Sequence, residues 1–587
     1  MRSRSVEFSL TGATLALTGL LLVTFVAFLG LTLFNTKGEP REAVVAVSML
    51  NQGNWVLPVS FGHDLPYKPP MLAWCIAAIG WLNGGHVTEF IARLPSALAA
   101  VAMIVCMFRF YARRQSMAVA MVAALLSATA FELHRAATSC RVDMLLAAFV
   151  VMAILSLYRH YEKQLPWWRL PLTAIALMSG GVLTKGPVGM LLPCGAMLAL
   201  LLLQRRRFWP AASQLTLYGL LALILPAAWY VAAYNAGGET FLNLAMEENF
   251  GRFMGKMSYE SHEHTFLYNF LTLAWGWAPW TLLAAASLLA WRKFPRSNNS
   301  RTTRLSQRIA RQWQRLRALP APELLAIAAS AVIFIFYCIP KSKRSVYLLP
   351  MYPFMAIGIA MAIRWLAANA PRVIRVYGTV MAAIGIVAGV AMTLAMLGLF
   401  DAAEGTRPAI YLAQATSLPA ISLIATAGIT IVLCTSLRSI CRGTAATAVQ
   451  WTVADTMLIY WIFSSSIQPV ALNPKSDIDV ARHIEATVPQ GEPLYGFMTA
   501  YQLRYYTAGF YTGDRIDGIA RICTPDPDPR SMAPAGWILA GEADTDSLRR
   551  FMPPGTQLEE IRHFDHKSCD NKQRPILFRY FITAAKP

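Results

Sequence analysis

Charged residues are scarce in this chain of 587 residues. They make up 14% of it, whereas hydrophobic residues make up 56%. An average soluble protein has about 25% charged residues. A soluble fold could not bury so much apolar surface, so the composition excludes an ordinary soluble protein, a disordered chain, a collagen and a disulfide scaffold. The sequence therefore predicts a polytopic membrane protein.

Acidic residues are the rarer charge, with 32 Asp and Glu against 52 Lys and Arg, for a net charge of +20. In a soluble protein this excess would suggest nucleic-acid binding. No basic patch is interleaved with aromatic residues in a polar domain, so we expect no nucleic-acid partner. In a membrane protein, Lys and Arg hold the loops between spans on the cytoplasmic side.

Several motifs are missing. The chain has no Cys-x-x-Cys, no spaced Cys/His set, no Walker loop, no Gly-x-Ser-x-Gly and no Rossmann fingerprint. A zinc site, a nucleotide-driven step and serine hydrolysis are therefore unsupported, and we expect no cofactor and no metal. His262 and His264 with Glu263 leave a divalent metal as an alternative, and Cys523 and Cys569 could pair if their region is extracytoplasmic.

Apolar segments of spanning length recur from Leu10 to about Val470, and about 20 residues each cross a bilayer. Met1–Glu7 carries two Arg before the first of them and predicts a signal anchor. About thirteen spans are expected by that length rule. They are 10–34, 88–108, 116–131, 142–158, 170–184, 187–203, 213–234, 266–291, 322–340, 346–363, 375–399, 415–436 and 445–469.

The Lys/Arg bias predicts a cytoplasmic N-terminus. Alternate loops are then Arg-rich and cytoplasmic, and the opposite loops hold nearly all the acids and His residues of this part of the chain. The Arg-rich loop after Trp291 is expected to be a topology anchor, with a basic helix on anionic lipid as the alternative. The functional chemistry is therefore expected on the extracytoplasmic face.

The composition becomes polar after about Leu472. Residues 473–587 are predicted to form a small α/β domain, and residues 1–472 the membrane domain. A helix is expected over 476–487, with strands at 494–497, 536–539 and 576–581. An odd number of spans places this domain on the extracytoplasmic side too.

The first extracytoplasmic loop carries three candidate residues. Glu39 and Arg41 begin a stretch that is amphipathic at helical spacing, and a carboxylate just outside the hydrocarbon can act as a general base. Lys68 lies between Tyr67 and two prolines, which limits the backbone and could direct its ammonium toward a phosphate. The alternative for each is a solvated interfacial charge.

Four further places carry candidate charges. Asp143 opens an apolar span, which is costly unless the acid is functional or paired, with Arg141 or Arg135. Lys185 lies in a tight turn between two apolar runs, and Arg252 is a good phosphate ligand. The cations at Lys341–Arg344, Lys343 among them, oppose the inside-positive bias, which an anionic lipid phosphate would explain.

These segments together resemble bacterial GT-C glycosyltransferases of the protein-mannosyltransferase/aminoarabinose-transferase superfamily, and among them most of all the transferases that act on lipid A. The resemblance covers most of the chain. It is carried by Glu39–Arg41, Gly53–Pro58, Lys68–Pro70, Ala92–Pro95, Arg141–Asp143, Lys185–Pro187, Asn249–Phe253, Pro279–Trp280 and Lys343–Pro350.

The resemblance implies a many-helix membrane domain, a periplasmic C-terminal domain and location in a bacterial inner membrane. It also implies inverting transfer of a sugar from a polyprenyl (undecaprenyl) phosphate to an envelope acceptor, a lipid A-like glycolipid or a protein. A transporter without chemistry is the alternative from another class, which the clustering of charges at one face disfavours.

The resemblance also implies roles for individual residues. The residues that would hold the donor phosphate are Lys68, Lys185, Arg252, Lys343 and Tyr347. Glu39 and Asp143 would be the catalytic or acceptor-positioning acids. Arg41 would orient the first loop, with Arg141 in support. The lipid A transferases usually have Asp-Glu-x-Arg where this chain has Gly38-Glu39-Pro40-Arg41, so the choice between Glu39 and Asp143 as the base stays open.

Overall fold

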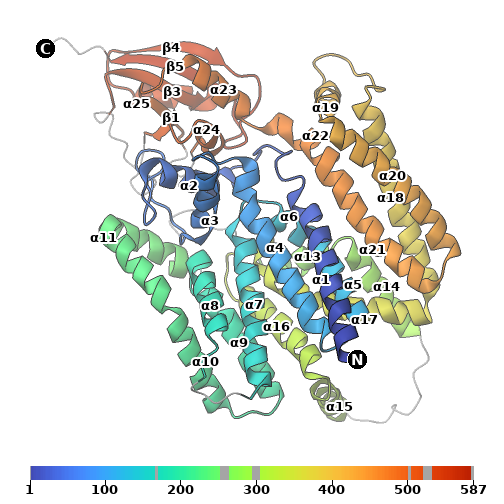
Figure 1. The fold of residues 1–587 in the computed structure, drawn as a ribbon. Coiled ribbons are helices and arrows are strands. Elements are labelled where there is room, and N and C mark those ends of the chain that lie inside the picture. Colours follow the sequence, from blue (N-terminus) through green and yellow to red (C-terminus); the bar gives the residue numbers. More distant parts are fainter. Residues whose placement is uncertain are drawn as a thin grey trace.

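A computed structural model describes residues 2–164, 169–251, 263–293, 305–499, 504–519 and 532–582. A bundle of long helices carries a small sheet domain at one end, and the N-terminus lies at the other end (Figure 1). The helices of the bundle are α1 (Arg2–Val26), α4 (Glu89–Ala112), α5 (Met117–Ala128), α6 (Phe131–Ala137), α7 (Val142–Glu162), α8 (Leu172–Lys185), α9 (Val188–Leu203), α10 (Phe208–Ala222), α11 (Ile224–Met246), α13 (Leu267–Gly276), α14 (Trp280–Lys293), α16 (Ala321–Cys338), α17 (Tyr352–Asn369), α18 (Pro371–Met396), α20 (Ala420–Arg442) and α21 (Ala445–Ile462).

The chain is a multi-pass membrane protein, as its composition predicts. Among the described residues, eight helices are long and apolar enough to cross a membrane, or up to ten if two bent pairs each count as one span. The bent pairs are α5 with α6, at 68°, and α13 with the start of α14, at 103°. The expected count of about thirteen is higher because α8 and α9 are apolar but short, and because α21 is not among the helices apolar enough to cross.

Small residues bring helices of the bundle close together. A Cβ at Gly189, near the start of α9, would lie 2.2 Å from the backbone carbon of Gly181 in α8. Glycine is therefore required for this close approach, as at many helix contacts in membranes. The contact fixes the turn between the two helices, which carries Lys185.

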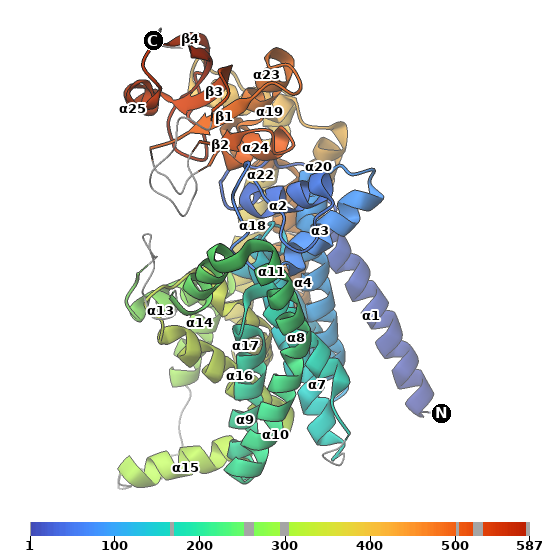
Figure 2. The ribbon, with the colours of Figure 1, turned by 90° about the vertical axis from the view of Figure 1, so that its left-hand side faces the viewer.

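A layer of short elements separates the bundle from the sheet domain. Helices α2 (Pro40–Gln52) and α3 (Met71–Leu82) lie in this layer, beneath α24 (Tyr506–Tyr511) (Figure 2). Pro40 is the first residue of α2, where its missing N–H costs nothing, and Gly53 follows the helix with φ of 63°. One face of α2 is buried, as its predicted amphipathic pattern requires.

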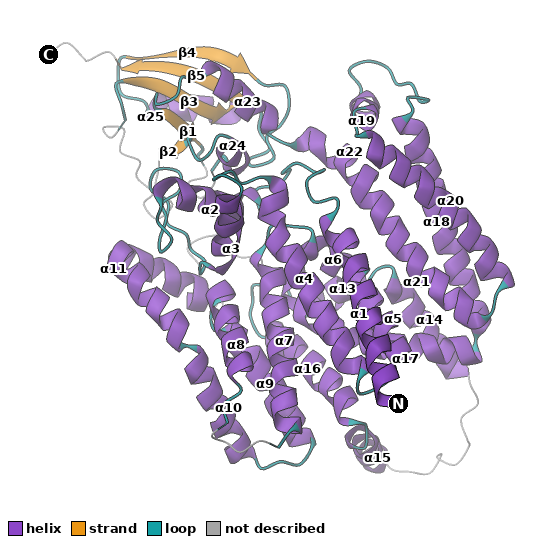
Figure 3. Ribbon diagram, in the orientation of Figure 1, coloured by secondary structure: helices purple, strands orange, loops and turns teal. Residues whose placement is uncertain are grey.

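The described residues of the sheet domain form a mixed sheet of five strands in the order β2-β1-β3-β5-β4 (Figure 3). The strands are β1 (Leu494–Phe497), β2 (Asp517–Gly518), β3 (Ala535–Gly541), β4 (Thr556–His563) and β5 (Pro575–Ile582). β1 is parallel to β2 and β3, and β5 is antiparallel to β3 and β4. Alternate residues of β3 enter two separate cores, one on each face.

The sequence predicts three of these strands and α23 (Ile478–Thr487) to within a few residues. Leu548 of α25 (Thr545–Phe551) packs in the core on one face of the sheet, and Val480 and Ile484 of α23 in the core on the other. The boundary at residue 472 stays a prediction. Outside the sheet domain, α15 (Leu305–Arg317) lies across the far end of the bundle (Figure 2).

Candidate functional site

The candidate site lies in the layer between the bundle and the sheet domain. A cavity of about 60 Å³ opens there between α2, the loop that leads to α3, and α24. The polar residues that line it include Arg41, Glu42, Tyr67, Lys68 and Tyr506. The cavity therefore joins the candidate segments around Arg41 and Lys68 to a residue of the C-terminal region.

Lys68 and Glu42 form an ion pair in this cavity. Arg41 lies 3.6 Å from the same carboxylate, and its guanidinium is 5.2 Å from the ring centre of Tyr67. Burial raises the pKa of Glu42, but Lys68 and Arg41 together have the larger effect. The pKa of Glu42 is therefore lowered to below its usual range. Glu42 is therefore ionised, and it shares its charge between two cations.

A second ion pair lies beside the first. Lys185, the last residue of α8, pairs with Asp143 in the first turn of α7. Its ammonium also lies 4.2 Å from the ring centre of Tyr347, in the 3₁₀ helix η2 (Ser345–Met351). Asp143 interacts electrostatically with Lys68, so the two pairs form one charged cluster. The structure thus brings together Arg41, Lys68, Asp143, Lys185 and Tyr347.

Glu39 lies in a different setting. Arg93 of α4 donates two hydrogen bonds to its carboxylate, at 2.8 and 3.0 Å, and the backbone N–H of Cys140 donates a third. Burial raises the pKa of Glu39, but Arg93 and the Cys140 bond lower it by more. Arg93 also donates to the carbonyls of Leu29 and Thr32. This arrangement holds the start of α2 to the bundle.

The other predicted residues make contacts of their own, and Arg141 also interacts electrostatically with Glu39 and Asp143. Lys343 is buried and donates to two backbone carbonyls, of His264 and Pro340. The guanidinium of Arg141 packs over Gly38, where a Cβ would lie 2.6 Å from its Nη2. Arg141 therefore occupies the space into which a side chain at position 38 would extend. Arg252 lies outside the described residues.

Each role that the sequence predicts for these residues stays a prediction.

The residue before the undescribed segment, Gly251, ends a π-helix, η1 (Glu247–Gly251). Within that helix, Asn249 Oδ1 lies against Gly186, which follows Lys185 with φ of 77°. A Cβ at Gly186 would clash with Asn249, so glycine is needed both for the turn and for this contact.

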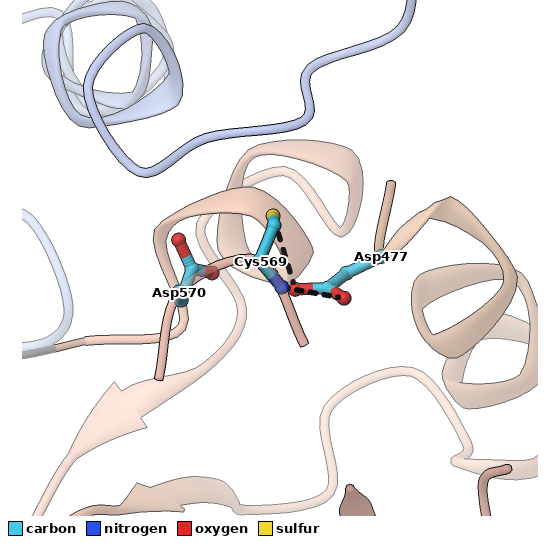
Figure 4. Close-up of side chains that lie close together, drawn as sticks. All are labelled: Asp477, Cys569 and Asp570. Carbon is cyan, nitrogen blue, oxygen red and sulfur yellow. Dashed lines mark hydrogen bonds between the residues drawn. The ribbon is translucent and has the colours of Figure 1, made fainter. Parts of the chain in front are cut away.

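Asp477, Cys569 and Asp570 form a group that could hold a metal, with ligand atoms all within 4.8 Å of one another (Figure 4). Their carboxylates already accept hydrogen bonds. Asp477 accepts from Ser568 Oγ at 2.7 Å, and Asp570 accepts from the N–H of Thr507 at 2.9 Å. These bonds explain the cluster as an anchor of the Cys569 loop on α23 and α24.

The earlier metal and disulfide alternatives involve undescribed residues. His262 and Cys523 both lie outside the described part of the chain. His264 is described and stacks on Tyr268, with ring centres 4.0 Å apart. Cys569 is a buried free thiol.

Sequence reasoning assigned no role to Glu42, Arg93 or Tyr506. Glu42 stands in the same motif as Glu39, and its position three residues later on a helix was a usable signal. Arg93 is a cation in an apolar span, which also suggests a buried partner. Tyr506 is more than 400 residues from the first loop in sequence, and no local pattern connects them.

Known proteins resemble this chain in sequence and in fold. Residues 67–231 match the family of dolichyl-phosphate-mannose-protein mannosyltransferases. The crystal structure of ArnT from Cupriavidus metallidurans bound to undecaprenyl phosphate superimposes with a TM-score of 0.68 at 18% identity, over 98% of this chain and 99% of that chain. The chain shares the fold of that structure. The resemblance read from the sequence motifs is confirmed at the level of the fold.

Curated relatives extend the comparison. An undecaprenyl phosphate-alpha-4-amino-4-deoxy-L-arabinose arabinosyl transferase of Erwinia tasmaniensis is 24% identical over 375 residues, which is 61% of this chain and 60% of the relative. A transferase of the same description from Serratia proteamaculans is 26% identical over 419 residues, 68% of this chain and 67% of the relative. The chain spans about three fifths of the length of most curated relatives it matches.

Proposed function

We propose that this protein is an integral membrane glycosyltransferase that moves a sugar from undecaprenyl phosphate to lipid A. The sugar we favour is 4-amino-4-deoxy-L-arabinose, because the Erwinia and Serratia relatives are described as transferases of that sugar. The alternative acceptor is a protein or another glycolipid, because the matching family is described by protein mannosylation. The fold supports both versions.

The observation that carries the proposal is the cluster of Arg41, Lys68 and Lys185 with the carboxylates of Glu42 and Asp143. In the proposed step, an acceptor oxygen attacks the anomeric carbon while the bond from that carbon to the phosphate oxygen breaks. The configuration at the anomeric carbon inverts, and the electron pair of the broken bond stays on the departing polyprenyl phosphate. Fixed cations stabilise the phosphate charge that develops there.

The carboxylates have a role that depends on the acceptor. An acceptor hydroxyl must lose its proton, and we propose that Asp143 or Glu42 receives it. An acceptor phosphate is already ionised and needs no base, so the carboxylates would then only position the cations. Arg252 and Tyr347 are proposed as further ligands of the donor phosphate, and Lys343 as a support for the segment that carries Tyr347.

We place this site on the periplasmic face of the inner membrane. The basic turns that follow α4, α7 and α9 lie at the end of the bundle opposite to the sheet domain (Figure 1). Lys and Arg favour the cytoplasmic side, so the site and the sheet domain are proposed to face the other compartment.

Lys68→Ala tests the proposal. We expect the rate of transfer from undecaprenyl phosphate-linked sugar to fall by about 100-fold, because a fixed charge on the leaving phosphate is lost. The readout is polyprenyl phosphate released by purified protein, with Lys68→Arg expected to retain part of the activity. Arg114→Gln is the matched control, because Arg114 pairs with Glu162 at the far end of the bundle. Equal activity in Lys68→Ala and wild type would contradict the proposal.

A further inference from the structure

The loop that carries Lys68 is held by the C-terminal region. Asp64 and Arg504 form a buried ion pair with two hydrogen bonds, at 2.8 and 3.1 Å, and both side chains are 6% exposed. The two residues are 440 positions apart in the sequence. A buried pair of this geometry is directional, so it fixes the position of Asp64 relative to α24.

The same region supports a strained turn. Phe61 has φ of 50°, in the left-handed region that costs an ordinary residue about 1 kcal/mol or more. Its N–H donates to Asp514 Oδ1 at 3.0 Å, and its carbonyl accepts from the N–H of Gly518 at 3.0 Å. Both backbone groups of the strained residue are therefore bonded to the C-terminal region.

Further contacts surround this turn. Ser48 of α2 donates to Asp514 Oδ2 at 2.6 Å, and Ser48 also lies 2.8 Å from the hydroxyl of Ser60. The ring of Tyr506 packs edge-on against Phe61, with ring centres 5.4 Å apart, and forms part of the cavity wall. The C-terminal region thus contacts both α2 and the loop that leads to α3.

The short segment from Asp64 to Lys68 links the position of Lys68 to that of Asp64. Its sequence is Asp64-Leu65-Pro66-Tyr67-Lys68, and two more prolines follow. Pro66 has its φ fixed near −65°, and Leu65 and Lys68 are restricted because each precedes a proline. The backbone from the ion pair to Lys68 therefore has fewer free rotations than an ordinary loop. A displacement of Asp64 is therefore passed on to Lys68 and to the cavity.

We infer that Arg504 is a positioning residue of the proposed transfer site, which holds the Lys68 loop in its binding conformation through Asp64. The sheet domain is then part of the site and not a separate appendage. This inference rests on the proposed function for its kinetic consequence, whereas the structural consequence stands by itself.

Arg504→Lys tests the structural consequence, because it keeps the charge and loses the two parallel hydrogen bonds. We expect faster hydrogen exchange in peptides that cover residues 58–70, with unchanged exchange in α7 and α18. Arg515→Lys is the matched control, because Arg515 pairs with Glu485 at 2.8 Å within the same domain. Exchange in 58–70 that matches wild type in Arg504→Lys would overturn the inference, whatever reaction the protein catalyses.

The kinetic consequence separates positioning from simple loss of structure. We expect Arg504→Lys to raise the KM for the lipid-linked sugar by about tenfold with kcat within about twofold, since a misplaced loop weakens uniform binding of the donor phosphate. A purely structural role would lower the amount of active protein and leave KM unchanged. Where single variants fold poorly, the exchanged pair Asp64→Arg with Arg504→Asp should restore the low KM, and failure to restore it counts against the inference.

The two proposals fail in different ways. If wild-type protein releases no polyprenyl phosphate but Arg504→Lys loosens residues 58–70, the transfer reaction is wrong and the positioning contact is right. If wild type is active and the exchange of residues 58–70 is the same in Arg504→Lys, the reaction stands and the positioning role is wrong.

Discussion

At the scale of single residues, the two glutamates of the first motif differ in their contacts: only Glu42 lines the cavity. Glu39 is bonded to Arg93 and to the N–H of Cys140, whereas Glu42 lines the cavity with Lys68. Glu39→Gln leaves the guanidinium of Arg93 buried without a charge partner, and breaking such a pair costs about 3–5 kcal/mol. We expect a lower melting temperature for Glu39→Gln but near-normal transfer per folded molecule.

Glu42→Gln should show a different balance. The melting temperature should fall less than in Glu39→Gln, because Lys68 and Arg41 are more exposed than Arg93, at 17% and 27% against 3%. Transfer should fall by about tenfold or more as the cations lose their charge partner. Thermal unfolding in detergent and release of polyprenyl phosphate measure the two effects on the same samples. Normal activity in Glu42→Gln, with activity lost in folded Glu39→Gln, would assign the catalytic acid to Glu39.

The sequence could not distinguish these two residues. Both are acids in one short motif, and what separates them is contact with residues elsewhere in the chain. Arg93 lies 54 positions from Glu39, and its partner could not be read from spacing. The sequence did single out Lys68 and Lys185, which lie in the charged cluster. A cation fixed by prolines, or by a tight turn beside an apolar span, is an unusual feature.

At the scale of elements, the sequence predicted the helices of the membrane domain. It did not predict which of these helices are long and straight enough to cross the membrane alone. Apolar length indicates a helix, but the bend between α5 and α6 and the shortness of α8 depend on packing. Strand β1 matches its expected range because a short apolar run between turns is a local signal. β4 was missed because most of its residues are exposed and carry no alternating pattern.

The contact of α8 with α9 gives a prediction at this scale. Gly189→Ala places a methyl group against the backbone of α8, and crowding of this kind costs about 1–3 kcal/mol. We expect a lower melting temperature together with weaker donor binding, because the turn with Lys185 must shift. Gly358→Ala in α17 is the control, since nothing lies within 4 Å of the added Cβ. A normal melting temperature in Gly189→Ala would show that the two helices can separate freely.

At the scale of the whole molecule, charge and architecture are arranged along one axis. The sheet domain covers the end of the bundle that contains the charged cluster (Figure 2). The other end carries the Arg-rich turns after α4, α7 and α9, together with α15. The sequence bias already predicted two different faces, but only the fold shows that residues from both ends of the chain line the same cavity.

This arrangement makes a definite prediction about sidedness. Alkaline phosphatase is active only where its disulfides form, in the periplasm, and such bonds are rare in the cytoplasm. Alkaline phosphatase fused after Pro587 should therefore be active, and green fluorescent protein at that position should stay dark. The same reporters inserted between Gln204 and Arg205, in the turn after α9, should give the reverse pattern. A bright fluorescent fusion after Pro587 would place the sheet domain in the cytoplasm, and a periplasmic lipid-linked donor could then not reach the cations that are proposed to bind it.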